Sequence, residues 1–179
     1  MRIILIGYMG AGKTTVGRAL AKALLLPFYD LDWYIASRHH KNAEVLFPEI
    51  GEEAFRRIEH SLLHEVAEFD DVVLSCGGGT PCFFDNMDYI NRQGVSIYLR
   101  ASVDVLCQHL KMARVQRPLL AGKTDEEVRR YITAHLQERE PFYLKAHHTV
   151  DISLLDTHRR IDQTIQQIIH LIDNPPSKA

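Results

Sequence analysis

The chain has 179 residues, of which 46% are hydrophobic and 25% charged, and this suits one globular domain with one substantial core. Its formal net charge of −2 excludes the broad positive field with which proteins hold nucleic acid. The three cysteines lack the spacing of a disulfide framework, and no run of about 18 apolar residues occurs, so we expect a cytoplasmic protein with reduced thiols and no membrane contact.

Strand-like and helix-like patterns alternate along the chain. Apolar runs predict strands at 2–6, 28–30, 72–75, 95–99 and 149–152. Helical periodicity marks 13–25, 32–39, 52–68, 103–110, 125–145 and 159–172, whereas 113–123 is a basic loop and 174–179 a disordered tail. This alternation predicts an α/β fold with a mainly parallel five-stranded sheet and helices on both faces. Ligands of such sheets bind beyond the carboxyl ends of the strands.

A phosphate-binding motif follows the first predicted strand. Residues 7–14 read GYMGAGKT and match G-x-x-x-x-G-K-[ST]. Glycines let backbone N–H groups turn inward toward phosphate oxygens, and the following helix adds its positive end. Lys13 is expected to reach the β- and γ-phosphates, and the Thr14 hydroxyl to bind Mg²⁺. The motif therefore predicts a protein that uses Mg-ATP.

Two carboxylates follow the second predicted strand, at Asp30 and Asp32. Alternate residues of an extended segment face the same way, so both could point toward the phosphate loop. One could then hold magnesium through water, while the other orients an attacking hydroxyl group. The alternative is that the pair caps a helix and supplies the acid of its first turn. A guanine-reading [NT]-K-x-D motif does not occur.

Further candidates come from the middle and end of the chain. Arg56 and Glu59 are three residues apart on one helix face, as either an exposed ion pair or a ligand contact. Three glycines, 77–79, directly follow a buried strand, and their ordering cost favours close approach to a ligand over a simple tight turn. Arg117 and Arg139 lie in RPLL and REPFY; each is a solvated surface group or a fork for a carboxylate or phosphate.

Taken together, GYMGAGKT, DLD, FRRIE, GGGT, RPLL and REPFY occur in the order and approximate spacing found in shikimate kinases, and the chain resembles that family over about residues 1–150. The resemblance implies transfer of the γ-phosphate of ATP to the 3-hydroxyl of shikimate, a step of chorismate and aromatic amino-acid synthesis. It also implies a P-loop kinase fold with a mobile lid. We expect one domain over 1–173, with a substrate-binding subdomain at about 32–60 and a lid at about 112–123, and a monomer.

The resemblance also assigns roles to individual residues. Those expected to wrap the nucleotide phosphates are Gly10, Ala11, Gly12, Lys13, Thr14 and Thr15. Those expected to bind shikimate are Asp32, Arg56, Gly78 and Arg139, with both arginines on its carboxylate. Supporting positions are Asp30, which would hold Mg²⁺ through water, Glu59, Gly77 and Gly79. Arg117 would reach the ATP phosphates from the lid. Lys13, Asp32 and Arg117 are thus the implied catalytic residues, and whether Asp32 is a base or an orienting acceptor stays open.

Some features stand apart from this pattern. The segment 38–42, RHHKN, departs from the R-T-G type found in many members, and Pro48 falls in the wall of the expected substrate subdomain. His60 and His64 share a helix face without H-E-x-x-H order, so we expect packing or surface roles and no zinc.

Two other functions are considered: a gluconate-kinase-like P-loop kinase and a nucleotide-dependent regulatory module with an inactive site. The FRRIE and GGGT pair argues against the first. The complete set of charged residues argues against the second.

Overall fold

The computed structural model describes residues 1–113 and 122–174. The strands are β1 (Arg2–Ile6), β2 (Phe28–Asp30), β3 (Val72–Ser75), β4 (Val95–Arg100) and β5 (His148–Asp151). The helices are α1 (Lys13–Leu24), α2 (Leu31–His39), α3 (Ala43–Ile50), α4 (Glu52–Val66), α5 (Asn86–Gln93), α6 (Val103–Met112), α7 (Asp125–Tyr143) and α8 (His158–Asp173), with a 3₁₀ turn η1 (Thr80–Cys82). No helix within these two ranges is long and apolar enough to cross a membrane.

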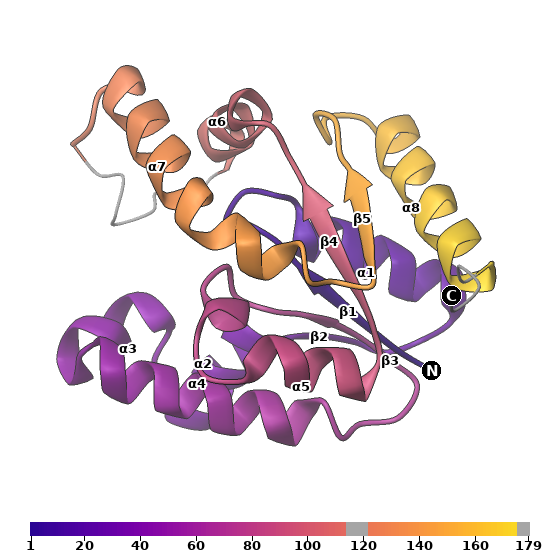
Figure 1. Cartoon of the computed structure of the whole chain (residues 1–179), viewed down its shortest axis with the longest axis horizontal. Coiled ribbons are helices and arrows are strands. Elements are labelled where there is room, and N and C mark those ends of the chain that lie inside the picture. Colours follow the sequence, from indigo (N-terminus) through magenta and orange to yellow (C-terminus); the bar gives the residue numbers. More distant parts are fainter. Residues whose placement is uncertain (114–121, 175–179) are drawn as a thin grey trace.

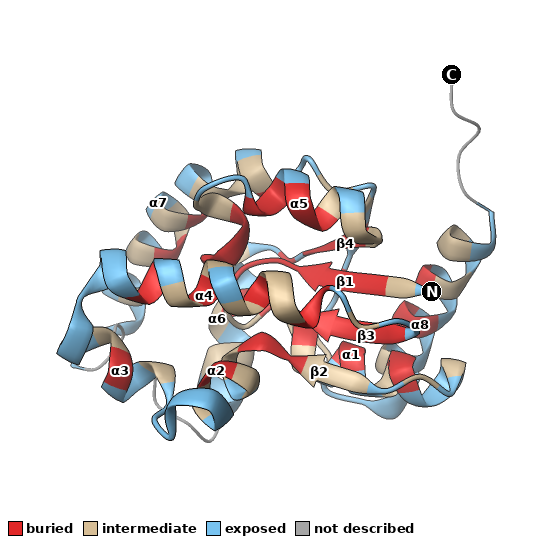
Figure 2. Ribbon diagram, turned by 90° about the horizontal axis from the view of Figure 1, so that it is seen from below, coloured by how far each residue is buried: buried red, intermediate tan, exposed pale blue. Residues whose placement is uncertain are grey.

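The five strands form one sheet in the order β2-β3-β1-β4-β5, and every pairing is parallel. Helices α1 and α8 pack against each other on one side, while α4 and α5 lie on the other (Figure 1). The central strands are buried on both faces (Figure 2), which is why they read as continuous apolar runs rather than alternating ones. The predicted fold class is confirmed.

Two helices and a turn were not predicted from the pattern. Helix α3 has only eight residues and contains Pro48, but the Asn42 side chain caps it by accepting from the backbone N–H of Val45. Helix α5 is also eight residues long, and its N-cap Asp85 makes no side-chain capping bond. Short helices of this kind are stabilised by tertiary packing, because they are too short for a periodic signal.

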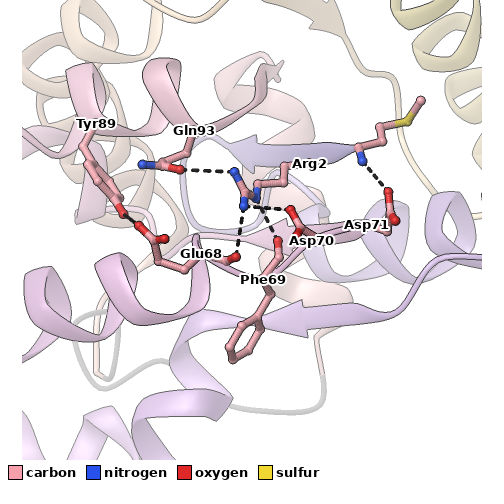
Figure 3. A network of polar contacts seen from close by, with 8 residues as sticks. Arg2, Glu68, Phe69, Asp70, Asp71, Tyr89 and Gln93 are labelled. Atoms are coloured by element: carbon pink, nitrogen blue, oxygen red, sulfur yellow. Dashed lines mark hydrogen bonds and ion pairs between the residues drawn. The ribbon is translucent and has the colours of Figure 1, made fainter.

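The amino end of β1 anchors the carboxyl end of α4. Arg2 donates from Nε to Phe69 O at 2.9 Å and from Nη2 to Glu68 O at 3.0 Å and to Asp70 Oδ1 at 2.8 Å, as Figure 3 shows. Its Nη1 donates to Gln93 of α5 at 3.4 Å. One side chain therefore satisfies two carbonyl groups of the α4–β3 loop and ties α4, α5 and β1 together.

Candidate functional site

The predicted site residues meet where three neighbouring strands end. Strands β2, β3 and β1 lie side by side, so Asp30, the Gly77–Gly79 turn and the phosphate loop emerge from adjacent positions. A pocket of about 380 Å³ opens there. It is lined by Met9, Gly10, Gly12, Lys13, Thr14, Thr15, Asp30, Asp32, Ser75, Cys76, Gly77, Gly78, His109, Met112, Ala113 and Leu155.

The phosphate loop has the backbone that its glycines allow. Gly10 and Gly12 have φ of 81° and 80°, in the left-handed region that favours glycine. Gly12 is the N-cap of α1, so the positive end of the helix points at the pocket. The Lys13 ammonium group donates to Gly7 O and Tyr8 O at 2.9 Å each, and the residue as a whole is only 9% exposed. A buried cation is thus held over the loop in a geometry suited to phosphate.

The two aspartates reach the pocket differently from the prediction. Asp30 ends β2 and is the N-cap of α2, accepting from the backbone N–H of Asp32 at 3.1 Å, and Asp32 lies in the first turn of that helix. The expectation that both lie on an extended segment was wrong, because the chain turns into a helix at Leu31. The capping alternative is therefore correct, yet both residues also line the pocket. Asp30 Oδ2 accepts from the Thr14 hydroxyl at 2.8 Å.

Arg56 and Glu59 form a buried ion pair rather than an exposed one. Arg56 is 8% exposed and Glu59 1% exposed, and Nη1 donates to Glu59 Oε2 at 2.8 Å. The other carboxylate oxygen of Glu59 accepts from the Thr80 hydroxyl at 2.6 Å. The guanidinium group lies 4.3 Å from the ring centre of Phe83. Its Nε has no hydrogen-bond partner among the described residues, so a buried cationic donor remains available.

The three glycines each make room for a different part of the site. A Cβ atom on Gly77 would lie 3.0 Å from both Asp32 Oδ1 and Glu59 Oε1. One on Gly78 would lie 3.2 Å from Met9 N and 3.6 Å from Arg139 Nη1. One on Gly79 would lie 2.6 Å from Arg56 Nη2. The turn therefore passes between the phosphate loop and the two arginines, and a side chain at Gly79 would clash while one at Gly77 or Gly78 would require neighbours to shift.

The pKa values of two cysteine thiols reflect their burial and the charged groups around them. Burial, together with Glu59, Asp30 and Asp32 and against the opposing effect of Lys13, raises the pKa of Cys76 well above its usual range. Burial raises the pKa of Cys82 to about 11, although Arg139 and Arg56 both act to lower it. Both arginines also border the glycine turn, Arg139 of α7 at Gly78 and Arg56 of α4 at Gly79. The helices carrying them are remote in sequence, and only the fold brings the two cations together.

Some assignments lie apart from the pocket. Arg56, Glu59, Gly79 and Arg139 are next to its Gly77–Gly78 wall without being part of its lining. Arg117 lies outside the described residues. In the departing segment 38–42, Arg38 bonds to Tyr34 and Glu65 on the outer side of α2 and α4.

Sequence reasoning missed several residues of the site. His109 donates from Nδ1 to Gly10 O at 2.7 Å and accepts the Leu155 backbone N–H at Nε2 at 2.8 Å, which fixes its neutral tautomer. It joins the phosphate loop to the segment between β5 and α8. Phe83 and Phe47 both lie beside the Arg56 guanidinium group. The adjacent glycine turn signalled Phe83, but nothing in the sequence pointed to His109.

Comparison with known proteins places these features in a family. A family model described as shikimate kinase matches residues 9–173. The shikimate kinase of Bacteroides fragilis is 49% identical over 97% of this chain and 97% of its own length. That of Phocaeicola vulgatus is 52% identical over 93% of this chain and 95% of its own length.

Solved structures give the same result. The shikimate kinase of Bacteroides thetaiotaomicron superposes with a TM-score of 0.95 at 47% identity, covering 97% of this chain and 99% of that one. Shikimate kinase from Acinetobacter baumannii in complex with shikimate has a TM-score of 0.84 at 32% identity, covering 99% and 95%. A gluconokinase from Sinorhizobium meliloti reaches a TM-score of 0.57 at 16% identity over 96% and 95%, a likeness of fold alone.

Proposed function

This chain belongs to the shikimate kinase family, and from that premise we propose that it transfers the γ-phosphate of ATP to the 3-hydroxyl of shikimate, as a cytoplasmic monomer. The observation that carries the proposal is the Gly77–Gly79 turn, which adjoins the phosphate loop at Gly78 and a buried arginine at Gly79. A nucleotide phosphate and an anionic acceptor would therefore bind on either side of one short backbone segment.

The nucleotide side consists of residues 10–15 with Lys13 at its centre. Phosphoryl transfer needs positioning and charge neutralisation more than covalent help. The Lys13 ammonium group is already oriented by two carbonyl groups, and it would bind the β- and γ-phosphates. Thr14 Oγ1 and the Asp30 carboxylate are adjacent oxygen donors, the ligand type that Mg²⁺ prefers, and they would hold that ion, Asp30 through water. When bound, the metal neutralises charge on the phosphate oxygens.

The acceptor side consists of Asp32, Gly78, Arg56 and Arg139. Arg56 retains an unpartnered Nε within the described part of the chain, and Glu59 and Phe83 fix its plane. Arg139 approaches the same turn at Gly78. Two arginines at one carboxylate would orient shikimate, and Asp32 at the pocket wall would accept a hydrogen bond from its hydroxyl group.

A role for Arg117 completes the proposal, and it rests on the R-P-L-L motif alone. A guanidinium group brought to the γ-phosphate would add positive charge where it develops in the transition state, and closure of the segment would exclude water as a competing acceptor.

The carboxylate assignment can be tested by a thermodynamic cycle. The methyl ester of shikimate keeps every ring hydroxyl but loses the negative charge. Each charge-assisted contact is worth about 1.5–3 kcal/mol, or roughly ten- to a hundredfold in affinity. We expect a strong loss of kcat/KM for the ester with the wild-type enzyme, and a much smaller further loss with Arg139→Ala. The two changes remove the same interaction, so their effects should not add.

All four combinations of enzyme and substrate are measured by coupled ADP release, with gluconate as a control acceptor. Fully additive losses would show that Arg139 does not hold the carboxylate. Turnover of gluconate in place of shikimate would overturn the proposed function itself.

A further inference from the structure

A second cluster of metal-ligating side chains lies outside the pocket, between α4 and the start of α5. His60 and His64, one turn apart on α4, meet Asp85 at the N-cap of α5. One potential ligand atom of each residue lies within 4.8 Å of those of the other two. The imidazole rings are 4.3 Å apart between centroids. Two histidines and one carboxylate at this separation fit around a single divalent ion.

The orientation of His60 is set by a neighbouring amide. Its Nδ1 lies 2.6 Å from Asn86 Oδ1, and the Asn86 amide nitrogen donates to Thr80 O at 2.8 Å. Because Asn86 Oδ1 is thereby the acceptor, His60 Nδ1 carries the proton and Nε2 keeps its lone pair. A histidine that gives one N–H to an oxygen and offers the other nitrogen is the usual arrangement of a metal ligand.

His64 contributes a nitrogen without a partner. Its Nε2 is buried and has no hydrogen bond to any described residue. The ring is stacked on Tyr89, with 3.5 Å between centroids and an interplanar angle of 11°. Tyr89 is in turn fixed because its hydroxyl lies 3.2 Å from Glu68 Oε1 and from His64 O (Figure 3 shows the Glu68 contact). A buried, unpaired nitrogen costs free energy unless something binds it.

The carboxylate of Asp85 supplies the negative charge. It is exposed and pairs only at 3.3 Å with Arg92, another exposed residue, among the described residues. The pair is weak because both groups are solvated, so a cation can compete for Asp85 at little cost.

We propose that His60, His64 and Asp85 bind one divalent transition-metal ion of the Zn²⁺ type, with water in the remaining position. Imidazole nitrogens with a single carboxylate select such ions over Mg²⁺ and Ca²⁺, which require oxygen ligands. The expectation of no zinc weighed His60 with His64 and His147 with His148, but no carboxylate. The third ligand comes from a loop 21 residues beyond His64 in the sequence (85 − 64).

The ion would join α4 to the segment that follows the glycine turn. Asn86, which orients His60, also holds Thr80, whose hydroxyl bonds to Glu59, the partner of Arg56. The proposed metal site is therefore linked to the acceptor site through three hydrogen-bonded side chains, those of Asn86, Thr80 and Glu59. This consequence rests on the proposed function, whereas the binding of the metal does not.

Calorimetric titration of the full chain with ZnCl₂, without nucleotide or Mg²⁺, tests the proposal. We expect one ion per chain. Asp85→Asn and His64→Gln should each weaken binding by about tenfold or more. Asp85→Asn keeps the side-chain shape at an exposed position, so it should fold normally. Arg92→Ala should strengthen binding, because it removes the cation that competes for Asp85. His158→Gln, an exposed histidine at the start of α8, is the matched control and should bind like the wild type.

Absence of binding, or equal affinity for the wild type, Asp85→Asn and His64→Gln, would overturn the proposal. Titration with CoCl₂ identifies the ligands independently. Absorption bands of a cobalt thiolate would place the ion on cysteine and also overturn it, whereas bands of nitrogen and oxygen ligation would support it. None of these measurements depends on kinase activity, so a failure here is distinct from a failure of the proposed function.

Discussion

The guanidinium group of Arg56 is fixed before any ligand binds. Glu59 accepts from one terminal nitrogen, Phe83 lies against the plane, and Gly79 leaves the space that the group occupies. A charge held this way loses little side-chain entropy on binding an anion. The buried pair is also sensitive, because removing Glu59 would leave the cation with only the longer contact to the exposed Glu52, at 3.5 Å, and breaking a buried ion pair typically costs about 3–5 kcal/mol. Glu59 therefore holds Arg56 in the orientation that the proposed acceptor site requires.

Lys13 provides the most direct test of the nucleotide side. We expect Lys13→Ala to lower kcat/KM by about 10²–10³ or more, because a donor aimed at developing charge is lost. The fold should survive, since the two hydrogen bonds that the ammonium group donates to Gly7 O and Tyr8 O lie within the phosphate loop itself. Coupled ADP release measures the activity and a thermal melt checks the fold. Turnover close to that of the wild type would contradict the assignment.

Substitution of Gly79 changes the space beside Arg56 without changing any charge there. Its φ of −86° and ψ of −23° suit alanine, so Gly79→Ala changes space but not backbone strain. The new Cβ atom would meet the Arg56 guanidinium group, which Glu59 and Phe83 prevent from moving freely. We expect KM for shikimate to rise by about ten- to a hundredfold with KM for ATP nearly unchanged.

The control for this change is the same substitution in an Arg56→Ala background. There the added methyl group has no guanidinium group to displace, so little further loss is expected. An equal loss in both backgrounds would show that Gly79 acts on something other than Arg56.

At the scale of elements, α4 links the proposed acceptor site to the core. Arg56 and Glu59 share one face of α4, and His60 and His64 lie on the same helix. Phe55, Leu63 and Val66 of this helix are buried. The register of this helix therefore decides whether the arginine reaches the glycine turn. Arg2 fixes that register by binding the carbonyl groups of Glu68 and Phe69 just beyond the helix end.

We expect Arg2→Ala to lower the free energy of unfolding by about 1.5–3 kcal/mol, the range for hydrogen bonds to a charged group. Arg2→Lys should recover part of that loss, because it keeps the charge without the planar fork. Urea denaturation measures both. A midpoint unchanged by Arg2→Ala would show that the contacts of Arg2 in Figure 3 contribute nothing to stability.

At the scale of the molecule, the sheet order places three strand ends at one edge. β3 lies between β2 and β1, so the glycine turn falls between the aspartates and the phosphate loop. Helix α7 brings Arg139 to the turn, and its Tyr143 donates to Gly78 O at 2.5 Å. His135 of the same helix lies 3.0 Å from the Tyr8 hydroxyl in the phosphate loop. Movement of α7 would therefore affect both the glycine turn and the phosphate loop.

The segment before α7 carries Arg117, and its proposed role is specific. We expect Arg117→Ala to lower kcat by as much as about 10³–10⁵, as for arginines that stabilise the transition state in related P-loop enzymes. Shikimate affinity should change much less. Steady-state kinetics with each substrate varied in turn separate the two effects. A variant defective only in shikimate binding would place Arg117 at the acceptor instead.

Local sequence was sufficient for much of this protein. Continuous apolar runs marked the strands, because strands buried on both faces admit few polar residues. The phosphate loop was evident because its chemistry is contained within eight adjacent residues. The acidic pair was found as well, but its geometry was misjudged, since the helix begins one residue earlier than predicted.

The tertiary structure alone decided the rest. Whether Arg56 is exposed or buried depends on Phe83 and Gly79, which are distant in sequence and meet it only after β3 pairs with β1. His109 reaches Gly10, and Asp85 reaches His64, through the same long-range packing. Sequence periodicity reports which residues share an element. It carries no information about which elements become neighbours, because that is set by the packing of the whole core.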